Sequence, residues 1–161
     1  MSSLAVVARH ATSEDIATLV SLYRDLEQEM ADLRPVWPYV DGVPEPAENA
    51  FALMIHADDW HVYVGEIDGQ PLGFLAARDE PLLPQAGGAT VGAIRYIYSE
   101  PEARRVGLGE ALTNLFLTEA RSRGIARFDA HVSPGHLDAK NFFESNGFKA
   151  RAIVMYTEDG A

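Results

Sequence analysis

One segment of this chain, residues 94–121, constrains its fold more than any other. It begins with the apolar and aromatic run Ile-Arg-Tyr-Ile-Tyr-Ser, which is typical of a β-strand. Pro101 follows and ends the strand, because proline has no N–H to give to a sheet ladder. A turn with Gly107 and Gly109 then leads into apolar residues at helical spacing: Leu108, Leu112, Leu115 and Phe116. The segment therefore predicts a strand, a tight turn and an amphipathic helix in direct succession.

Strand and helix patterns alternate along the rest of the 161 residues without a detectable repeat. The expected strands cover residues 6–9, 61–67, 71–78, 93–99, 128–132 and 152–157, and the expected helices cover residues 12–30, 47–57, 108–123 and 139–146. Asp68-Gly69 marks a hairpin turn between two of the strands. Four prolines between residues 33 and 49 predict an irregular loop there. Together these patterns predict a single domain over residues 1–161, of α/β (α+β) class, with one mixed sheet.

The composition excludes several classes of protein. The chain has no cysteine, which rules out disulfides, thiolate metal sites and a cysteine nucleophile. Its formal net charge of −11 argues against nucleic-acid binding, which usually needs a basic face. No apolar run approaches the ~20 residues that span a bilayer, and the apolar stretch at residues 4–8 lacks the basic flank of a signal peptide. We therefore expect a cytoplasmic protein without nucleic-acid or membrane partners. The histidines show no metal-ligand spacing, so we also expect no metal.

The negative charge is concentrated in the first part of the chain. Residues 1–90 contain 4 of the 13 Lys and Arg residues but 15 of the 24 Asp and Glu residues, whereas residues 91–161 contain nine of each kind. One interpretation is that the two parts present different potentials to different ligands. The other is a solvated acidic surface that aids solubility.

The turn before the helix predicted at residue 108 has the chemistry of a phosphate site. The N-terminus of a helix presents unpaired backbone N–H groups and the positive end of the helix dipole. Gly107 and Gly109 lack the Cβ atoms that would keep a pyrophosphate from the backbone, and Arg104 and Arg105 add positive charge. The turn is not a Walker loop, since no Gly-Lys-Ser/Thr follows, and it lacks the third glycine of a dinucleotide fingerprint. These features together predict a pyrophosphate cradle.

Two motifs resemble those of the GNAT (GCN-five-related N-acetyltransferase) superfamily. Residues 101–109, Pro-Glu-Ala-Arg-Arg-Val-Gly-Leu-Gly, resemble its coenzyme-A-binding motif. Residues 139–148, Ala-Lys-Asn-Phe-Phe-Glu-Ser-Asn-Gly-Phe, resemble its second motif, a helix that ends in Gly-Phe. The resemblance is strong between these motifs and architectural before them. It implies a single GNAT-like domain, with a mixed, mostly antiparallel sheet that is flanked by helices and splayed at its central strands.

The resemblance also implies roles for individual residues. Backbone N–H groups of six consecutive residues would hold the pyrophosphate of acetyl-CoA: Arg105, Val106, Gly107, Leu108, Gly109 and Glu110. The side chain of Arg104 would lie near that pyrophosphate. The backbone of Ile97 and Ser99 would pair with the pantetheine arm, and an N–H there would polarise the thioester carbonyl. Without a cysteine to carry the acyl group, a primary amine would attack the thioester directly.

Two departures from the family pattern bear on catalysis. Phe143 stands where many members have the tyrosine that protonates the leaving thiolate, and His136 stands where an asparagine is frequent. Tyr98, Tyr96 and His136 are candidates for the missing acid, although both tyrosines also fit a packing role on their strand. The glutamate that the family often carries near the start of this strand is replaced by Ala93, so no general base can be assigned.

The resemblance places the acceptor against the N-terminal half of the chain, which is the acidic half. We therefore expect a cationic acceptor, either a small-molecule amine or a peptide amine, with Trp37 and Tyr39 as a wall or lid over it. Two other functional hypotheses stay open. Phe143 and Ala93 suggest a non-catalytic acyl-CoA-binding or regulatory module of the same fold, and the cradle alone would also suit a nucleotide-phosphate binder. The final predicted strand could pair with a second copy of the chain in a homodimer.

Overall fold

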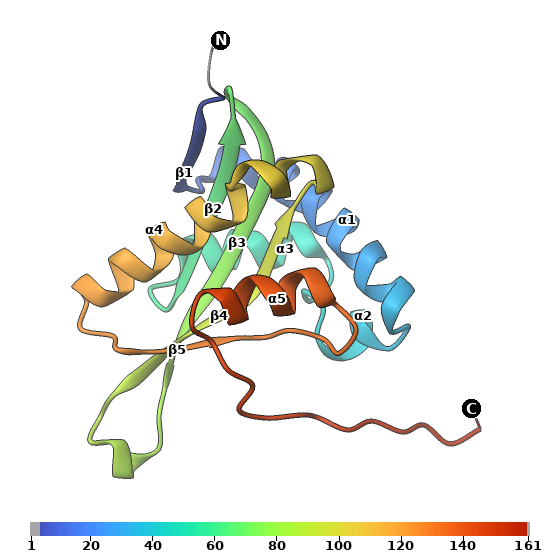
Figure 1. Cartoon of the computed structure of the whole chain (residues 1–161), viewed down its shortest axis with the longest axis vertical. Coiled ribbons are helices and arrows are strands. Elements are labelled where there is room, and N and C mark those ends of the chain that lie inside the picture. Colours follow the sequence, from blue (N-terminus) through green and yellow to red (C-terminus); the bar gives the residue numbers. More distant parts are fainter. Residues whose placement is uncertain (1–3, 161) are drawn as a thin grey trace.

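The computed structural model describes residues 4–160 and shows one five-stranded sheet (Figure 1). Its strands, in both sequence and spatial order, are β1 (Val6–His10), β2 (Trp60–Ile67), β3 (Gln70–Pro81), β4 (Thr90–Ser99) and β5 (Arg127–Ala130). Neighbouring strands from β1 to β4 are antiparallel, whereas β4 and β5 are parallel. The prediction of a mixed, mostly antiparallel sheet is confirmed.

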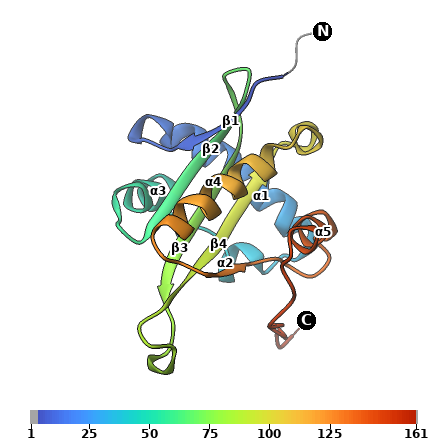
Figure 2. The same cartoon turned by 60° about the vertical axis from the view of Figure 1, so that its left-hand side comes forward.

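Helices cover both faces of this sheet (Figures 1 and 2). On one face lie α1 (Ile16–Leu33), α2 (Trp37–Val40) and α3 (Ala47–His56), with the short 3₁₀ turn η1 (Ser13–Asp15) before them. On the other face lie α4 (Leu108–Ser122) and α5 (Leu137–Ser145). Two more 3₁₀ turns, η2 (Pro84–Ala86) and η3 (Pro101–Val106), precede β4 and α4. Each face therefore has its own hydrophobic cluster, one under α1 and α3 and the other under α4.

Local sequence explains where several elements begin and end. Asp68 and Gly69, with φ angles of 51° and 81°, form the two-residue turn between β2 and β3. Gly124, with φ of 89°, ends α4, and the N–H of Ile125 donates to the oxygen of Ala120 at 3.1 Å. Both features were predicted from the sequence, and both depend on residues that accept a positive φ.

Two predictions about local structure are wrong. Residues 33–49 are not a continuous irregular loop, because they contain the short helix α2, whose first residue, Trp37, is buried with its ring centre 6.3 Å from that of Tyr23. Residues 152–157 were expected to form a strand, but they form neither helix nor strand and are exposed. Their apolar residues fit the strand pattern, yet within residues 4–160 no strand pairs with them. We call residues 149–160 the C-terminal segment; Figure 1 shows it extending away from the rest of the molecule.

Strands β4 and β5 separate halfway along β4. Their pairing runs from Val91 to Ile94, and the last bond joins the N–H of His131 to the oxygen of Ile94 at 3.0 Å. At the same place β4 carries a bulge at Arg95 relative to β3. On the side away from β3, residues 95–99 consequently have no strand partner in the part of the chain that the structure describes. We call these residues the open edge of β4; they are the splay expected of the sheet.

The first residue of α4 sits on two glycines of the sheet. Leu108 is fully buried, and a Cβ atom at Gly65 in β2 would lie 2.7 Å from its Cδ1 atom. A Cβ atom at Gly73 in β3 would lie 2.7 Å from the carbonyl oxygen of Tyr98 and 3.0 Å from Cδ2 of Leu108. The two glycines let α4 approach the sheet closely, and this contact fixes the start of the helix beside the end of β4.

We predict that Gly73→Ala lowers the free energy of unfolding by about 1–3 kcal/mol, because the added methyl group overlaps a backbone oxygen that cannot move without disturbing β4. Urea denaturation measures this loss. Gly109→Ala is the matched control, since its added Cβ would meet no heavy atom closer than 3.8 Å. Equal losses in the two variants would contradict the packing argument.

Candidate functional site

The turn between β4 and α4 leaves backbone donors without acceptors. Gly107 joins η3 to α4 with φ of 87° and ψ of 20°, a left-handed conformation that favours glycine. The first bond of the helix joins the N–H of Ala111 to the oxygen of Gly107 at 3.0 Å. No group within residues 4–160 accepts a hydrogen bond from the N–H of Leu108, Gly109 or Glu110. These three donors point out of the helix at the positive end of its dipole, which suits an anion.

The six residues expected to surround a pyrophosphate therefore divide into two groups. Leu108, Gly109 and Glu110, and Gly107 before them, have N–H groups with no acceptor within residues 4–160, whereas Arg105 and Val106 belong to η3. The side chain of Arg105 is exposed and forms no ion pair with any residue that the structure describes. Positive charge beside the unpaired amides can therefore come from Arg105.

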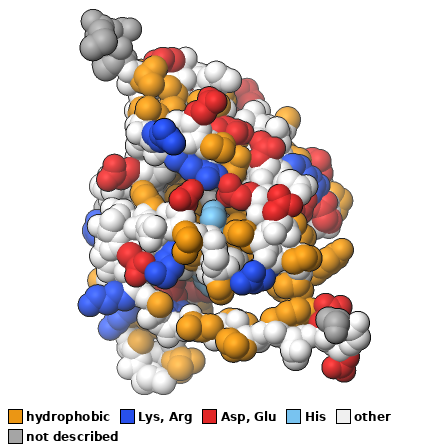
Figure 3. All heavy atoms as spheres, turned by 45° about the vertical axis from the view of Figure 1, so that its right-hand side comes forward, with side chains coloured by type: hydrophobic (Ala, Val, Ile, Leu, Met, Phe, Trp, Pro, Cys, Tyr) orange, Lys and Arg blue, Asp and Glu red, His pale blue; other side chains and the backbone are white. Residues whose placement is uncertain are grey.

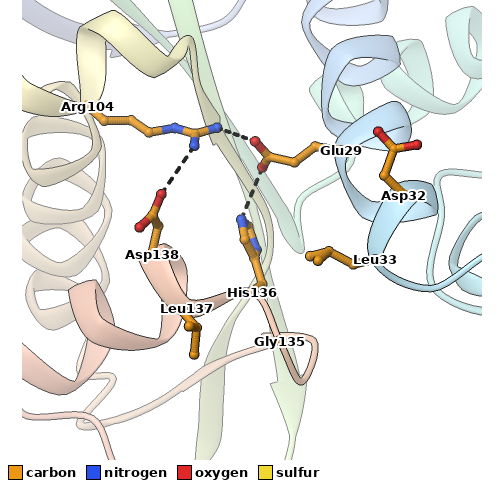
Figure 4. A pocket seen from close by; sticks show the side chains of 8 residues that line it. All are labelled: Glu29, Asp32, Leu33, Arg104, Gly135, His136, Leu137 and Asp138. Atoms are coloured by element: carbon orange, nitrogen blue, oxygen red, sulfur yellow. Dashed lines mark hydrogen bonds and ion pairs between the residues drawn. The ribbon is translucent and has the colours of Figure 1, made fainter.

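Arg104 has a different environment from Arg105, because its guanidinium contacts several elements at once (Figure 4). Its Nε donates to the carbonyl oxygen of Ser99 at 2.9 Å, and its Nη2 donates to Oε1 of Glu29 at 2.8 Å. Its Nη1 lies 3.7 Å from Oδ2 of Asp138, and the guanidinium carbon lies 5.5 Å from the centre of the Tyr98 ring. Arg104 thus ties η3 to β4, α1 and α5, and these contacts occupy the group that we expected beside the pyrophosphate.

A hollow of about 340 Å³ lies between α1, η3 and the start of α5. Its lining consists of Glu29, Asp32, Leu33, Arg104, Gly135, His136, Leu137 and Asp138 (Figure 4). The Nε2 atom of His136 lies 3.0 Å from Oε2 of Glu29. His136 and Arg104 hold the pKa of the Glu29 carboxyl below its usual range, although partial burial acts in the opposite direction. Glu29 is therefore a carboxylate at neutral pH, in contact with two basic side chains.

Glu29 was not identified from the sequence. It lies on a helix rich in acidic residues, and its partner Arg104 is 75 positions further along the chain. No local pattern distinguishes it from Glu27 or Asp32. Only the packing of α1 against η3 and α5 singles it out.

The open edge of β4 faces this same region. The N–H of Glu100 donates to the oxygen of Leu72 at 2.8 Å, on the β3 side. Because backbone groups of successive strand residues point to alternate sides, those of Ser99 and Ile97 point to the open edge. The oxygen of Ser99 accepts the bond from Arg104 described above. The two strand residues predicted to meet a ligand through their backbone are thus placed on the unpaired side of the sheet.

Tyr98 and Tyr96 pack on the opposite face of β4 from Ile97, in the cluster under α1. The Tyr98 hydroxyl lies 3.4 Å from Glu100, and burial raises the pKa of Tyr98 to about 12. The Tyr96 hydroxyl donates to the oxygen of Gly42 at 3.0 Å, so its strand position and its hydroxyl both serve packing. Of the candidate acids, His136 alone lines the hollow.

Phe143 is buried among aromatic rings and is remote from solvent. Its ring centre lies 5.1 Å from that of Phe142 and 5.2 Å from that of Phe148, in the cluster under α4. It therefore contributes to the core, and it has no hydroxyl group that could donate a proton.

Trp37 and Tyr39, expected over an acceptor, have different environments. Trp37 is only 7% exposed and belongs to the core under α1. Tyr39 is 87% exposed and lines a second hollow of about 400 Å³, together with Arg24, Glu27 and Glu45 among others. Of the two aromatic residues, Tyr39 is the one whose side chain a ligand can reach.

No helix within residues 4–160 is long and apolar enough to cross a membrane. Among those same residues, no group of three or more His, Asp or Glu side chains is arranged to hold a metal ion.

A sequence model of the Acetyltransferase (GNAT) family matches residues 21–148. The chain therefore belongs to this family, and the resemblance drawn from its two motifs is confirmed. An uncharacterised N-acetyltransferase of Methanocaldococcus jannaschii is 28% identical over 146 residues, which cover 91% of this chain and 62% of that relative. A mycothiol acetyltransferase of Thermomonospora curvata is 27% identical over 132 residues, which cover 74% of this chain and 42% of that relative. The chain thus spans less than two thirds of the length of these curated relatives.

The fold is similar to that of the aminoglycoside N-acetyltransferase AAC(6')-Iy, whose structure contains CoA. The TM-score is 0.74 at 17% sequence identity, over 99% of this chain and 98% of the other. At this identity the similarity establishes a common fold.

We predict that Arg104→Lys lowers the free energy of unfolding by about 1–2 kcal/mol, because an ammonium group cannot reach Ser99, Glu29 and Asp138 together. Thermal or urea denaturation tests this. Arg105→Lys keeps the same charge at an exposed position and serves as the control, with no change expected. An Arg104→Lys protein as stable as the control would show that the three contacts contribute nothing to stability.

Proposed function

We propose that this chain is an N-acetyltransferase that transfers the acetyl group of acetyl-CoA to a primary amine. The observation that carries the proposal is the set of unpaired N–H groups of Leu108, Gly109 and Glu110, placed next to the open edge of β4. Membership of the GNAT family supports it, as does the presence of CoA in the structure of AAC(6')-Iy.

The residues at the turn fit the diphosphate of coenzyme A. Three N–H donors lie at the positive end of a 15-residue helix, and the exposed Arg105 precedes them by three residues. Gly107 and Gly109 place no Cβ atom beside these donors. The open edge offers Ile97 and Ser99 as strand partners for the amide groups of pantetheine. A backbone N–H at this edge would polarise the thioester carbonyl and stabilise its negative charge as the amine attacks.

The absence of cysteine supports direct transfer from the thioester to the amine. In this mechanism the chain's contribution is to orient the amine beside the carbonyl carbon and to remove one of its protons. Thiolate release needs no acyl-enzyme intermediate.

Charge around the hollow supports a cationic acceptor. Glu29, Asp32 and Asp138 line it, and Arg104 is the one strongly basic side chain among them. Figure 3 looks onto this side of the molecule, where acidic side chains gather around a histidine. We infer that the acceptor is a small-molecule amine or a peptide amine that carries positive charge. The exposed ring of Tyr39 is then a wall for its more distant parts.

The proposed activity is tested with a panel of amines: spermidine, kanamycin, a peptide with a free N-terminus, and glutamate as an anionic comparison. Release of free thiol from acetyl-CoA reports turnover, and calorimetry reports acetyl-CoA binding. We expect binding, and turnover with at least one cationic amine. Tight binding without turnover on a wide range of amines would favour a non-catalytic acyl-CoA-binding module, and ATP competing as well as CoA would favour a nucleotide-phosphate binder. Turnover confined to glutamate would contradict the charge argument.

We predict that Gly107→Asp weakens acetyl-CoA binding by at least about tenfold more than Gly107→Asn does. Asn and Asp have the same shape and both tolerate the left-handed backbone of this position better than other residues do. Only Asp adds a negative charge beside the pyrophosphate, and charge-assisted contacts contribute more than neutral ones. Calorimetry with acetyl-CoA measures both affinities, and circular dichroism checks that both variants fold. Equal affinities would mean that the pyrophosphate is bound elsewhere.

A homodimer is the partner arrangement that the C-terminal segment supports. Ile153, Val154 and Met155 are at least 75% exposed, although they are apolar. The segment is attached near β5 by two hydrogen bonds from Arg151 to the carboxylate of Asp129, at 2.7 and 2.6 Å. Since β5 is the last strand of the sheet among residues 4–160, its outer edge has no strand partner there and could pair with an extended segment of a second copy.

We therefore predict that light scattering gives the mass of a dimer for the wild type and of a monomer for Val154→Asp. The charge would be buried in the dimer contact but is harmless on an exposed segment. Leu53→Asp, at an apolar position of α3 that is 74% exposed, is the control and should remain dimeric. A wild-type monomer would refute this arrangement.

A further inference from the structure

A carboxylate and an imidazole face each other inside the hollow. Glu29, on α1, has a side chain that is 29% exposed, and His136, the residue before α5, has one that is 16% exposed. Oε2 of Glu29 lies 3.0 Å from Nε2 of His136. That oxygen is itself buried, and no group within residues 4–160 forms an aligned hydrogen bond with it, so the imidazole lies at contact distance without completing one. Within the same residues, nothing forms a hydrogen bond with Nδ1 of His136. One ring nitrogen is therefore directed to a carboxylate, and the other remains for a ligand.

The side chains around the pair carry more negative than positive charge. From η3, Arg104 contacts Oε1 of Glu29 at 2.8 Å. From α1 and α5, Asp32 and Asp138 line the same hollow, and Asp138 lies 3.7 Å from Arg104. The carboxylates thus outnumber the arginine three to one, so the hollow offers net negative charge to a cationic acceptor.

We propose that His136 accepts a proton from the acceptor ammonium and that Glu29 is the residue that positions its ring. This inference rests on the proposed acetyltransferase function and supplies the base that the sequence lacks. Ala93 cannot act in the place of the usual glutamate, and Phe143 is a buried ring without a hydroxyl. His136 lines the hollow next to the open edge of β4, where the thioester would lie.

The proton transfers balance through this one imidazole. Nδ1 of His136 takes a proton from the ammonium, and the neutral amine then attacks the carbonyl carbon, forming the C–N bond. The C–S bond breaks, and the thiolate sulfur takes the proton from the imidazolium, which returns to its neutral form. The second proton lost by the nitrogen as the amide forms goes to solvent. Glu29 remains ionised throughout and stabilises the imidazolium in between.

The test compares His136→Ala and Glu29→Gln with two matched controls that lie outside the hollow, the exposed residues His56→Ala and Glu144→Gln. For each protein, kcat/KM is measured with the best cationic amine of the panel across a range of pH, and acetyl-CoA affinity is measured by calorimetry. Thermal unfolding establishes that each variant folds.

We expect His136→Ala to lower kcat/KM about 10²-fold near neutral pH, and Glu29→Gln to lower it less. Both losses should shrink as the pH rises past about 10.4, the ordinary pKa of a lysine-like amine, because the amine then becomes largely neutral without help from a base. Acetyl-CoA affinity should stay within about twofold of the wild type, because neither group is placed at the pyrophosphate. The two controls should match the wild type.

Losses of the same size at every pH would overturn the proposal, because they would indicate a structural role. Full activity of His136→Ala would overturn it as well. If His136→Ala does not fold, Glu29→Gln decides by the same pH criterion, since it retains the size of the side chain. A wild type that binds acetyl-CoA but acetylates no amine would refute the proposed function itself. An active wild type whose His136→Ala and Glu29→Gln variants are equally active would refute only the proposed roles of these two residues.

Discussion

The divergence of β4 from β5 after Ile94 is the constraint on which the rest of this structure depends. A parallel pair of strands needs a crossover, and α4 provides it by running across the sheet from the end of β4 to the start of β5. Leu108 fixes where that crossover begins, because it rests on Gly65 and Gly73 and leaves no room for a side chain at either. The unpaired amides of the helix and the unpaired edge of the strand therefore lie side by side as a consequence of one packing arrangement.

Arg104 connects this arrangement to the acidic half of the chain. A guanidinium offers donors in several directions, so one side chain can hold the end of β4 and the carboxylate of Glu29 at once. The positions of α1 and of the start of α5 are thereby linked to the turn at which a phosphate would bind. In this protein of net charge −11, the two adjacent arginines Arg104 and Arg105 have different environments. Arg104 is enclosed by acidic side chains, and Arg105 stays exposed beside the helix N-terminus.

Features that depend on neighbouring residues could be predicted from the sequence. The strand, turn and helix around Gly107, the hairpin at Asp68 and the end of α4 at Gly124 all rest on local backbone preferences, and the structure contains each of them. The order of elements and the family motifs were sufficient for the splayed, mixed sheet. The C-terminal segment shows the limit of such patterns, because its apolar run at residues 152–157 forms a strand only if another strand edge is available to pair with it.

The candidate site depends on contacts between distant parts of the chain, and there the sequence was less informative. From the sequence, Trp37 was expected to form a wall over a ligand. In the structure it is buried, with its ring close to that of Tyr23. Glu29 is distinguished from other acidic residues only by its contacts with Arg104 and His136, which follow it by 75 and 107 positions. Aromatic and acidic residues on an amphipathic helix are too common for any one of them to be singled out without its partners.

The exchange of a tyrosine for Phe143 follows from the same geometry. Phe143 packs against Phe142 and Phe148 and is only 3% exposed, and a buried hydroxyl without a partner is costly. A thiolate with an ordinary pKa of about 8.5 takes a proton more readily from an imidazolium than from a phenol, since the imidazolium is the stronger acid by roughly three units. If His136 accepts the proton removed from the amine, the same imidazole can then donate that proton to the thiolate. A separate tyrosine then adds little to the reaction, and the position becomes available to the core.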